Sequence, residues 1–338
     1  MSETEATPVA KKNNSWIIQW IIGIFLTGGF IFVLSRIVSW EEMKTALASI
    51  KPATFALLFG IYLVSMLARA WGWQILLERR VSLWRAMLGL NEGYLLNNIL
   101  PLRLGEIGRA FLIGRRTGRG TLSTLSTVVV ERAYDLAIAA GLLLSTLPFA
   151  LKMDWARPAA LVLLLIVIGA LVFLYFAAHN RVRLEAWLVK KLGHIGLFNR
   201  FLLPMGHSLL EGFAVLTRFE YFALSLFALL LSWGTALIRD YIILQNLAPG
   251  APLWWAMLTM SVANLGGALP SMMASLGTFE GAATGAMVLI GAKPEVGLVY
   301  AIIVHVIHLV SSSIIGLIGI MQEGQSLSKI ISDLRSIR

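Results

Sequence analysis

Several apolar runs in this sequence are each about long enough to cross a lipid bilayer. Residues 16–34 and 159–176 contain no Asp, Glu, Lys or Arg. A transmembrane helix needs about 20 such residues, because the hydrocarbon core is about 30 Å thick. Charged residues make up only 14% of the chain, against about 25% in soluble domains, so a soluble core does not explain these runs. The sequence therefore predicts an all-α, polytopic integral membrane protein.

Two further apolar stretches, 84–113 and 253–292, are interrupted by Pro101 and Pro270, and glycine follows closely in each. Proline removes a helix donor and glycine loosens the backbone, so each stretch should break into two pieces. Each piece covers about half of the bilayer core. We interpret both stretches as re-entrant helical hairpins, and a pair of short full spans is the alternative. The uninterrupted spans are expected at residues 16–38, 53–77, 121–148, 156–178, 220–246 and 296–321.

The basic residues indicate the orientation. Lys and Arg gather in segments 78–120 and 179–219 and are sparse in the other loops. Since such residues mark the cytoplasmic side, we expect the polar tails 1–15 and 323–338 in the cytoplasm, and the protein in the cell (cytoplasmic, or inner) membrane. Segment 181–203 mixes basic and apolar residues and is expected along the cytoplasmic interface. The net charge of +10 therefore reflects membrane topology, and nucleic acid is not an expected partner.

The order of these segments predicts an inverted repeat. Residues 16–150 and residues 151–322 each contain two spans, an interrupted hairpin and a third span, and the two halves begin on opposite sides. Inverted repeats with broken helices are typical of transporters, whose site lies at the repeat interface near the bilayer midplane. The matched spacings are 32 residues from Arg69 to Pro101 against 31 from Arg239 to Pro270, and 25 residues both from Glu106 to Glu131 and from Glu280 to His305.

Charged residues lie inside the expected spans. Glu131, Arg132 and Asp135 are about ten residues into one span, where a charge costs at least about 2.5–3.5 kcal/mol. Their spacing places them close together on the helix. They either line a polar cavity or form a self-neutralising structural pair that holds helices together. Arg69, late in its span, either joins such a cavity or snorkels to the interface.

The first hairpin suggests a phosphate site. Its polar residues include Asn98, Arg103, Glu106 and Arg109. A half-helix starting near Leu104 would present N–H groups and a positive dipole end, which suit an anion. Arg103 and Arg109 could add bidentate contacts to a phosphate. Ordinary positive charge in a cytoplasmic loop is the alternative.

The second half carries fewer charges. Arg239 and Asp240 form a candidate pair that either contributes to the site or neutralises itself, and Asn264 and Glu280 belong to the second hairpin. His305 has a second histidine three residues further on, but no third ligand is evident, so no metal site is expected. A protonation role for His305 with Glu280 is the functional alternative to simple packing.

The motif residues resemble a known family. Residues 98–110 carry the pattern P-x-R-x-G-E-x-x-R, and residues 128–135 end in E-R-x-x-D. Together they resemble the transmembrane flippase domain of lysylphosphatidylglycerol synthases, a family that has stand-alone members without the synthase domain. The resemblance continues through residues 269–282 and covers most of the chain. It carries over seven motif residues: Arg103, Glu106, Arg109, Glu131, Arg132, Asp135 and Glu280.

The resemblance implies movement of a polar-headed lipid between leaflets, such as aminoacylated phosphatidylglycerol or another anionic or isoprenoid-linked lipid. Two departures fall in the second half. The family often reads P-x-P-G-G-x-G before the hairpin glutamate, where this chain has Pro270-Ser-Met-Met-Ala-Ser-Leu-Gly277. The last span often carries arginine where this chain has His305. Both departures bear on head-group preference.

We therefore expect a lipid flippase or scramblase-like transporter for a membrane lipid with a phosphate-containing head group. Glu131, Asp135 and Glu280 would pair with cationic parts of the head group or carry protons. A secondary transporter of a small anion and a non-transporting subunit of a lipid-modifying complex are the alternatives. No enzyme motif is evident, so we expect neither catalysis nor a cofactor. The sequence leaves open a homo-oligomer or a lipid-synthesising enzyme as partner.

Overall fold

The computed structural model describes residues 40–48, 50–100, 104–151, 156–192, 213–267 and 273–322. The expected span 16–38, both polar tails, Arg103 and the two hairpin prolines lie outside these ranges. Four helices are long and apolar enough to cross a membrane, namely α3 (Pro52–Leu76), α6 (Thr121–Leu151), α10 (Phe219–Leu247) and α13 (Pro294–Gln322). At 1.5 Å per residue they are about 37–46 Å long. The expected all-α, multi-pass membrane architecture is confirmed.

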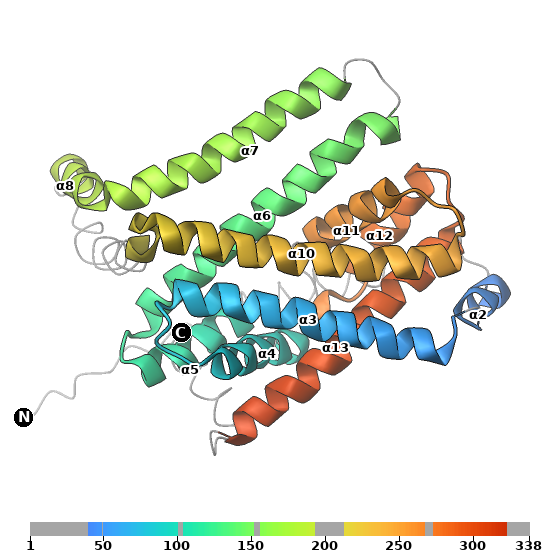
Figure 1. Cartoon of the computed structure of the whole chain (residues 1–338), viewed down its shortest axis with the longest axis horizontal. Coiled ribbons are helices and arrows are strands. Elements are labelled where there is room, and N and C mark those ends of the chain that lie inside the picture. The colour runs from blue at the N-terminus through green and yellow to red at the C-terminus, as the bar shows by residue number, and fades with distance from the viewer. Residues whose placement is uncertain are drawn as a thin grey trace, which may run out of the picture.

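The remaining helices are shorter or less apolar (Figure 1). The continuous helix α7 covers the expected span 156–178, and α8 covers the first part of the expected interfacial segment. Figure 1 shows α8 turning away from the axis of α7. The bounds are α2 (Trp40–Ala48), α4 (Leu83–Ile99), α5 (Gly105–Thr117), α7 (Ala156–His179), α8 (Arg181–Leu192), η3 (Phe213–Thr217), α11 (Leu253–Gly267), η4 (Met273–Ser275) and α12 (Thr278–Leu289).

Both interrupted stretches break as expected. The first becomes α4 and α5, which pack against each other, and the second becomes α11, η4 and α12, with α11 packed against α12. The end of the first break is fixed locally, because the side-chain oxygen of Asn97 accepts a hydrogen bond from the Gly105 N–H at 2.7 Å. The re-entrant path of the two pairs stays a prediction.

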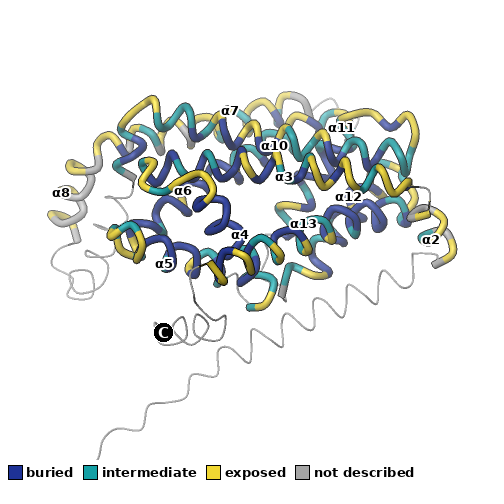
Figure 2. The backbone as a smooth tube through the Cα atoms, turned by 60° about the horizontal axis from the view of Figure 1, so that its bottom comes forward, coloured by how far each residue is buried: buried dark blue, intermediate teal, exposed yellow. Residues whose placement is uncertain are grey.

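The packing of the helices follows the division into two halves. Helix α3 lies along α10 in both views (Figures 1 and 2). Across the halves, α4 packs on α13 and α11 packs on α6; within them, α5 packs on α6 and α12 packs on α13. Each contact turns into another one on this list when α3, α4, α5 and α6 are exchanged for α10, α11, α12 and α13.

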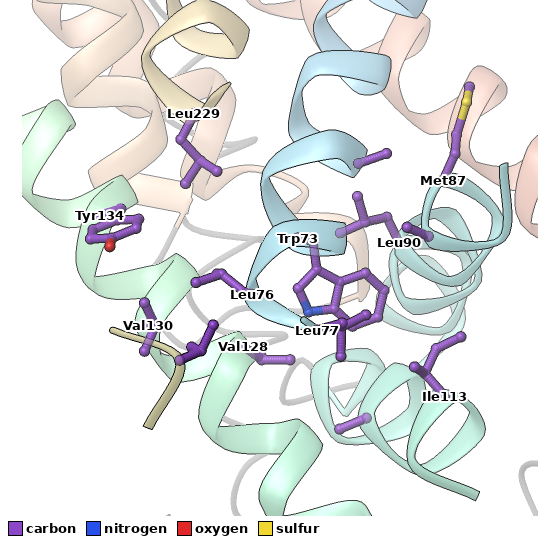
Figure 3. Packing of buried hydrophobic residues seen from close by; sticks show 14 of the residues in the cluster. Trp73, Leu76, Leu77, Met87, Leu90, Ile113, Val128, Val130, Tyr134 and Leu229 are labelled. Atoms are coloured by element: carbon purple, nitrogen blue, oxygen red, sulfur yellow. The ribbon is translucent and has the colours of Figure 1, made fainter. Parts of the chain in front are cut away.

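Apolar side chains fill the space between α3, α4, α5, α6 and α10 (Figure 3). Trp73 is fully buried at their centre, and its Nε1 donates a hydrogen bond to Thr127 Oγ1 at 3.0 Å. Apolar residues also cover the outside, as on α7, where Leu165 and Phe173 are 67% and 71% exposed. An apolar exterior suits lipid, where close packing and buried hydrogen bonds hold helices together.

The α4–α5 pair depends on two glycines. A Cβ atom on Gly105 would overlap the backbone oxygen of Gly93 and come within 2.8 Å of the Asn97 backbone nitrogen. Backbone atoms cannot move aside as a flexible side chain can. The two helices therefore approach so closely only because Gly105 has no side chain.

Replacing Gly105 by alanine should destabilise the protein by about 1–3 kcal/mol, the usual cost of overpacking, or by more. Thermal unfolding of the purified protein in detergent would measure the loss. Gly60→Ala is the matched control, because a Cβ atom there meets no atom within 4 Å and alanine favours a helix. Equal unfolding temperatures for the two variants would show that the close approach is not required.

Candidate functional site

A cavity of about 670 Å³ lies among α3, α4, α6, α10, α11 and α13. It collects candidate residues from both halves of the chain. The candidates that line it are Arg69, Asn98, Glu106, Arg132, Asp135, Arg239, Asp240, Asn264 and His305. Arg109, Glu131 and Glu280 lie behind this lining and contact it through ion pairs.

Both broken stretches end at this cavity. Asn98 lies at the end of α4, and its side-chain amide donates hydrogen bonds to Ser312 at 3.3 Å and Ser313 at 3.0 Å on α13. Gly267, the last residue of α11, and Ser275 of η4 line the opposite part. The chain also contacts itself between α4 and η4. Broken helices that end at a shared polar cavity are characteristic of transporter sites.

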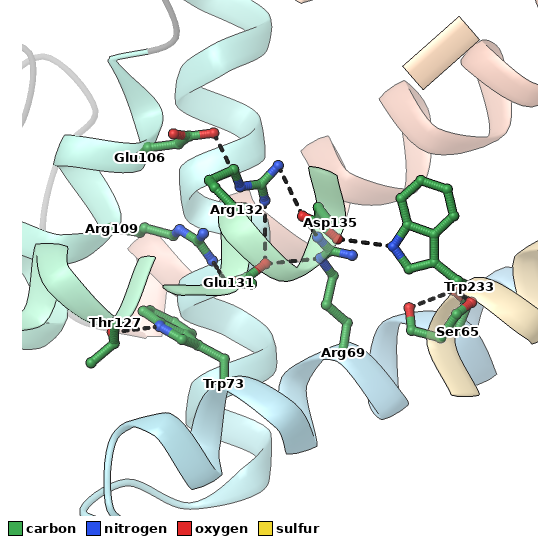
Figure 4. A network of polar contacts seen from close by, with 11 residues as sticks. Ser65, Arg69, Trp73, Glu106, Arg109, Thr127, Glu131, Arg132, Asp135 and Trp233 are labelled. Carbon is green, nitrogen blue, oxygen red and sulfur yellow. Dashed lines mark hydrogen bonds and ion pairs between the residues drawn. The ribbon is translucent and has the colours of Figure 1, made fainter. Parts of the chain in front are cut away.

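Glu131 is the centre of an arginine–carboxylate network (Figure 4). Its carboxylate lies 3.0 Å from Arg69 Nε, 2.9 Å from Arg109 Nη1 and 3.2 Å from Arg132 Nη2. These arginines come from α3, α5 and α6 respectively. One buried carboxylate thus joins three helices.

Asp135 extends the network to a fourth helix. It forms an ion pair with Arg69, accepts a hydrogen bond from Trp233 Nε1 of α10 at 2.9 Å, and lies 3.3 Å from Arg132 Nη1. Glu106 closes the network at 3.5 Å from Arg132 Nε. With three arginines and three carboxylates, the network is electrically balanced when all six groups are ionised.

Exposure divides this network into a buried part and a part that faces the cavity. The side chains of Glu131 and Arg109 are 0% and 2% exposed, whereas those of Arg132 and Glu106 are 30% and 25% exposed. Arg132 and Glu106 can therefore contact a ligand directly. Glu131 can act only through the arginines that it holds.

Arg109 is not at the membrane interface, where we expected it to meet a phosphate. Its guanidinium stacks over the Trp73 ring at 4.7 Å and pairs with Glu131, away from the cavity lining. Helix α5 does begin where expected, but its first N–H already binds Asn97. This position makes Arg109 a positioning residue for Glu131. Arg103, the other expected phosphate ligand, lies outside the described residues.

The Arg239–Asp240 pair faces the cavity from α10. Arg239 Nε and Nη2 lie 2.8 and 2.7 Å from Asp240 Oδ1. The hydroxyl of Tyr300 on α13 donates a hydrogen bond to Asp240 Oδ2 at 2.9 Å. The structure thus brings this pair together as expected and adds Tyr300.

Glu280 and His305 meet across α12 and α13. Glu280 Oε2 accepts a hydrogen bond from the Gly277 N–H at 2.7 Å, and Glu280 Oε1 bonds His305 Nδ1. Asn264 lines the cavity but donates its amide to the Met260 backbone oxygen of its own helix, at 2.8 Å. Within the described residues, no group of three or more His, Asp or Glu has the arrangement of a metal site.

Two lining residues that we did not single out follow a simple helical rule. Tyr62 lies seven residues before Arg69, and Trp233 lies seven residues before Asp240. Seven residues are about two helical turns, so each aromatic residue shares a face with a charged candidate. That periodicity could have identified both residues.

The departure in the second hairpin concerns backbone conformation. Ala274 and Ser275 adopt φ values of 57° and 58°, in the left-handed region that favours glycine. Counted back from Gly277, these two residues occupy the adjacent glycine positions of the pattern P-x-P-G-G-x-G. Both line the cavity, so this chain keeps a glycine-like turn at the site with non-glycine residues.

The comparisons with known proteins agree with this architecture. No curated protein matches the chain. The family model described as the lysylphosphatidylglycerol synthase TM region matches residues 20–316, which is nearly the whole chain. The match includes the broken helices and every charged residue of the cavity lining. The chain therefore belongs to the lysylphosphatidylglycerol synthase transmembrane-region family.

Proposed function

We propose that this protein moves a lipid with a phosphate-containing head group between the leaflets of a membrane. The observation that carries the proposal is the charged cavity of about 670 Å³ among helices that can cross a bilayer. Its volume lies within the range of about 300–1,000 Å³ that is usual for small-ligand sites. That space accommodates a head group while the acyl chains remain in the surrounding lipid.

The charges support binding more than helix association alone. Buried ion pairs that only hold helices together need no exposure to a cavity. Arg132 is nearly one-third exposed there, and its guanidinium offers the planar donor array that suits phosphate. Glu106 and Asp135 can pair with a cationic part of the head group. The proposal assigns no chemical step to these residues, so the lipid is made elsewhere.

A lateral opening favours a lipid over a small soluble anion. Leu136 lines the cavity and is also 55% exposed on the outer surface. It lies one helical turn after Arg132, so an apolar surface adjoins a cavity cation on the same face of α6. A lipid can place its head group at Arg132 and its acyl chains along Leu136. A water-soluble anion gains nothing from this arrangement.

The exchange symmetry of the helix packing supports alternating access as the mechanism. Two similar halves around one site can rock against each other and open the site to either side in turn. Re-entrant hairpins that enter from opposite faces, and cytoplasmic termini, belong to this proposal. An incoming head group would compete with Glu106 and Asp135 for Arg132.

The test is lipid movement by the purified protein alone in liposomes. Phosphatidylglycerol with a fluorescent acyl chain is placed in both leaflets, and dithionite quenches the outer leaflet. We expect quenching of the inner pool to accelerate over protein-free liposomes, without uptake of radiolabelled inorganic phosphate. Phosphate uptake without lipid movement would favour the anion transporter. Rates equal to those of protein-free liposomes would favour the non-transporting subunit.

A further inference from the structure

We propose that His305 and Glu280 form a proton-binding site, and that protonation of His305 prepares the cavity for an anionic head group. The proton would be the second ligand of the transporter. This inference rests on the proposed function and adds the group through which the site responds to protons. It is carried by the charge balance of the cavity and by the geometry of the pair.

The described site has one more carboxylate than arginine. Its arginines are Arg69, Arg109, Arg132 and Arg239, and its carboxylates are Glu106, Glu131, Asp135, Asp240 and Glu280. With His305 neutral and the other groups ionised, the set has a net charge of −1 and opposes an anion. One proton on His305 makes the set neutral. The protonation of a single side chain thus changes the sign of the balance that a phosphate meets.

The geometry determines where the proton binds. His305 Nδ1 bonds the Glu280 carboxylate, whose other oxygen is held by the Gly277 N–H. This bond places a hydrogen on Nδ1, so an incoming proton takes the lone pair of Nε2. Water supplies the proton, and no bond of the lipid breaks. The Phe279 ring lies 5.2 Å from the imidazole, and His305 lines the cavity, where it can meet the head group.

Histidine is the side chain suited to this task. Arginine stays charged, and histidine ordinarily titrates near pH 6.5. His308 also lines the cavity, but it is enclosed by the rings of Tyr62 and Tyr94, with centroids 5.9 and 5.0 Å away. The other titratable or charged groups at the cavity are Tyr62 and Arg69 on α3, Tyr94 on α4, Glu106 on α5, Arg132 and Asp135 on α6, Arg239 and Asp240 on α10, Glu280 on α12, and Tyr300 and His308 on α13.

The two halves differ at this point. Glu131 and His305 each lie 25 residues after a hairpin glutamate. In the first half, Glu131 meets three arginines, whose charge does not change with pH. In the second half, the corresponding position carries a group whose charge does change. The first half thus supplies permanent charge, and the second half supplies charge only when a proton is bound.

Three variants test the proposal in the liposome assay with fluorescent phosphatidylglycerol, between pH 5.5 and pH 8. Wild-type flux should fall with rising pH by at most about tenfold per unit, the limit for one linked proton. His305→Arg carries a permanent charge and should keep high flux at pH 8. His305→Gln should stay slow at every pH. His308→Gln is the matched control and should keep the wild-type profile.

A second measurement separates this inference from the proposed function. In protein labelled with ¹³C-histidine, the resonance that disappears in His305→Gln reports its protonation directly. Adding phosphatidylglycerol should shift its titration to higher pH, because the bound phosphate stabilises the imidazolium. Wild-type flux with the same pH profile in all three variants, or a titration unmoved by lipid, would overturn the proton site. Absence of flux in the wild type at every pH would instead contradict the proposed function, and the lipid-induced shift would still decide the proton site.

Discussion

Replacing Glu131 by glutamine should destabilise the protein by about 3–5 kcal/mol, the cost of removing one partner from a buried ion pair. Arg69 and Arg132 keep Asp135 as a partner. Glu131 is the partner that holds the buried guanidinium of Arg109, which in the variant retains its charge without that carboxylate. Thermal or denaturant unfolding in detergent would measure the loss.

A second substitution should reverse much of this loss. Arg109→Gln added to Glu131→Gln removes the stranded charge, so the double variant should be more stable than Glu131→Gln alone. Glu106→Gln is the matched control, because Glu106 is partly exposed and contacts Arg132 only at 3.5 Å. It should change stability by less than about 1 kcal/mol. If Glu131→Gln is as stable as Glu106→Gln, the network does not hold the helices together.

Replacing Arg132 by glutamine should slow lipid movement about 10- to 100-fold. This range corresponds to the loss of one charged hydrogen bond to the head group, about 1.5–3 kcal/mol. Stability should change little, because Arg132 is partly exposed and Asp135 and Glu131 keep Arg69. The dithionite assay measures the flux, and an unfolding scan of the same preparation measures the stability.

Two controls accompany Arg132→Gln. Arg132→Lys should recover only part of the flux, since lysine keeps the charge but lacks the planar pair of donors. Arg183→Gln removes an arginine from α8, an exposed helix away from the cavity, and should leave the flux unchanged. Wild-type flux in Arg132→Gln would remove Arg132 from the head-group site.

The sequence predicted the elements better than their three-dimensional contacts. Apolar length identified the spans, and proline with glycine identified both breaks, because these are local properties of the chain. The shared spacing of 25 residues identified Glu280 and His305, which form a direct contact. The corresponding Glu106 and Glu131 are joined only through Arg132.

The sequence did not predict which charges are buried. Glu131, Arg132 and Asp135 were interpreted as a set on one helix, but Arg69, Arg109 and Trp233 join them from three other helices. Neutralising only the first three residues would therefore leave two arginines without carboxylates from this set. Arg109 was misplaced for the same reason. Its burial depends on Trp73 of α3, and helical periodicity gives no information about which helix lies opposite.

The most direct test of the central claim is to block the cavity of a transporting protein. The chain has no cysteine, so an introduced cysteine is its single thiol. Ala236 lines the cavity, whereas Ile238, two residues further along α10, is 55% exposed on the outer surface. Ala236→Cys and Ile238→Cys are each labelled with a bulky, membrane-permeant thiol reagent, and mass spectrometry confirms complete modification. The account predicts that labelling abolishes lipid flux in Ala236→Cys and leaves it unchanged in Ile238→Cys. Undiminished flux through fully labelled Ala236→Cys would contradict the claim that the head group passes through this cavity.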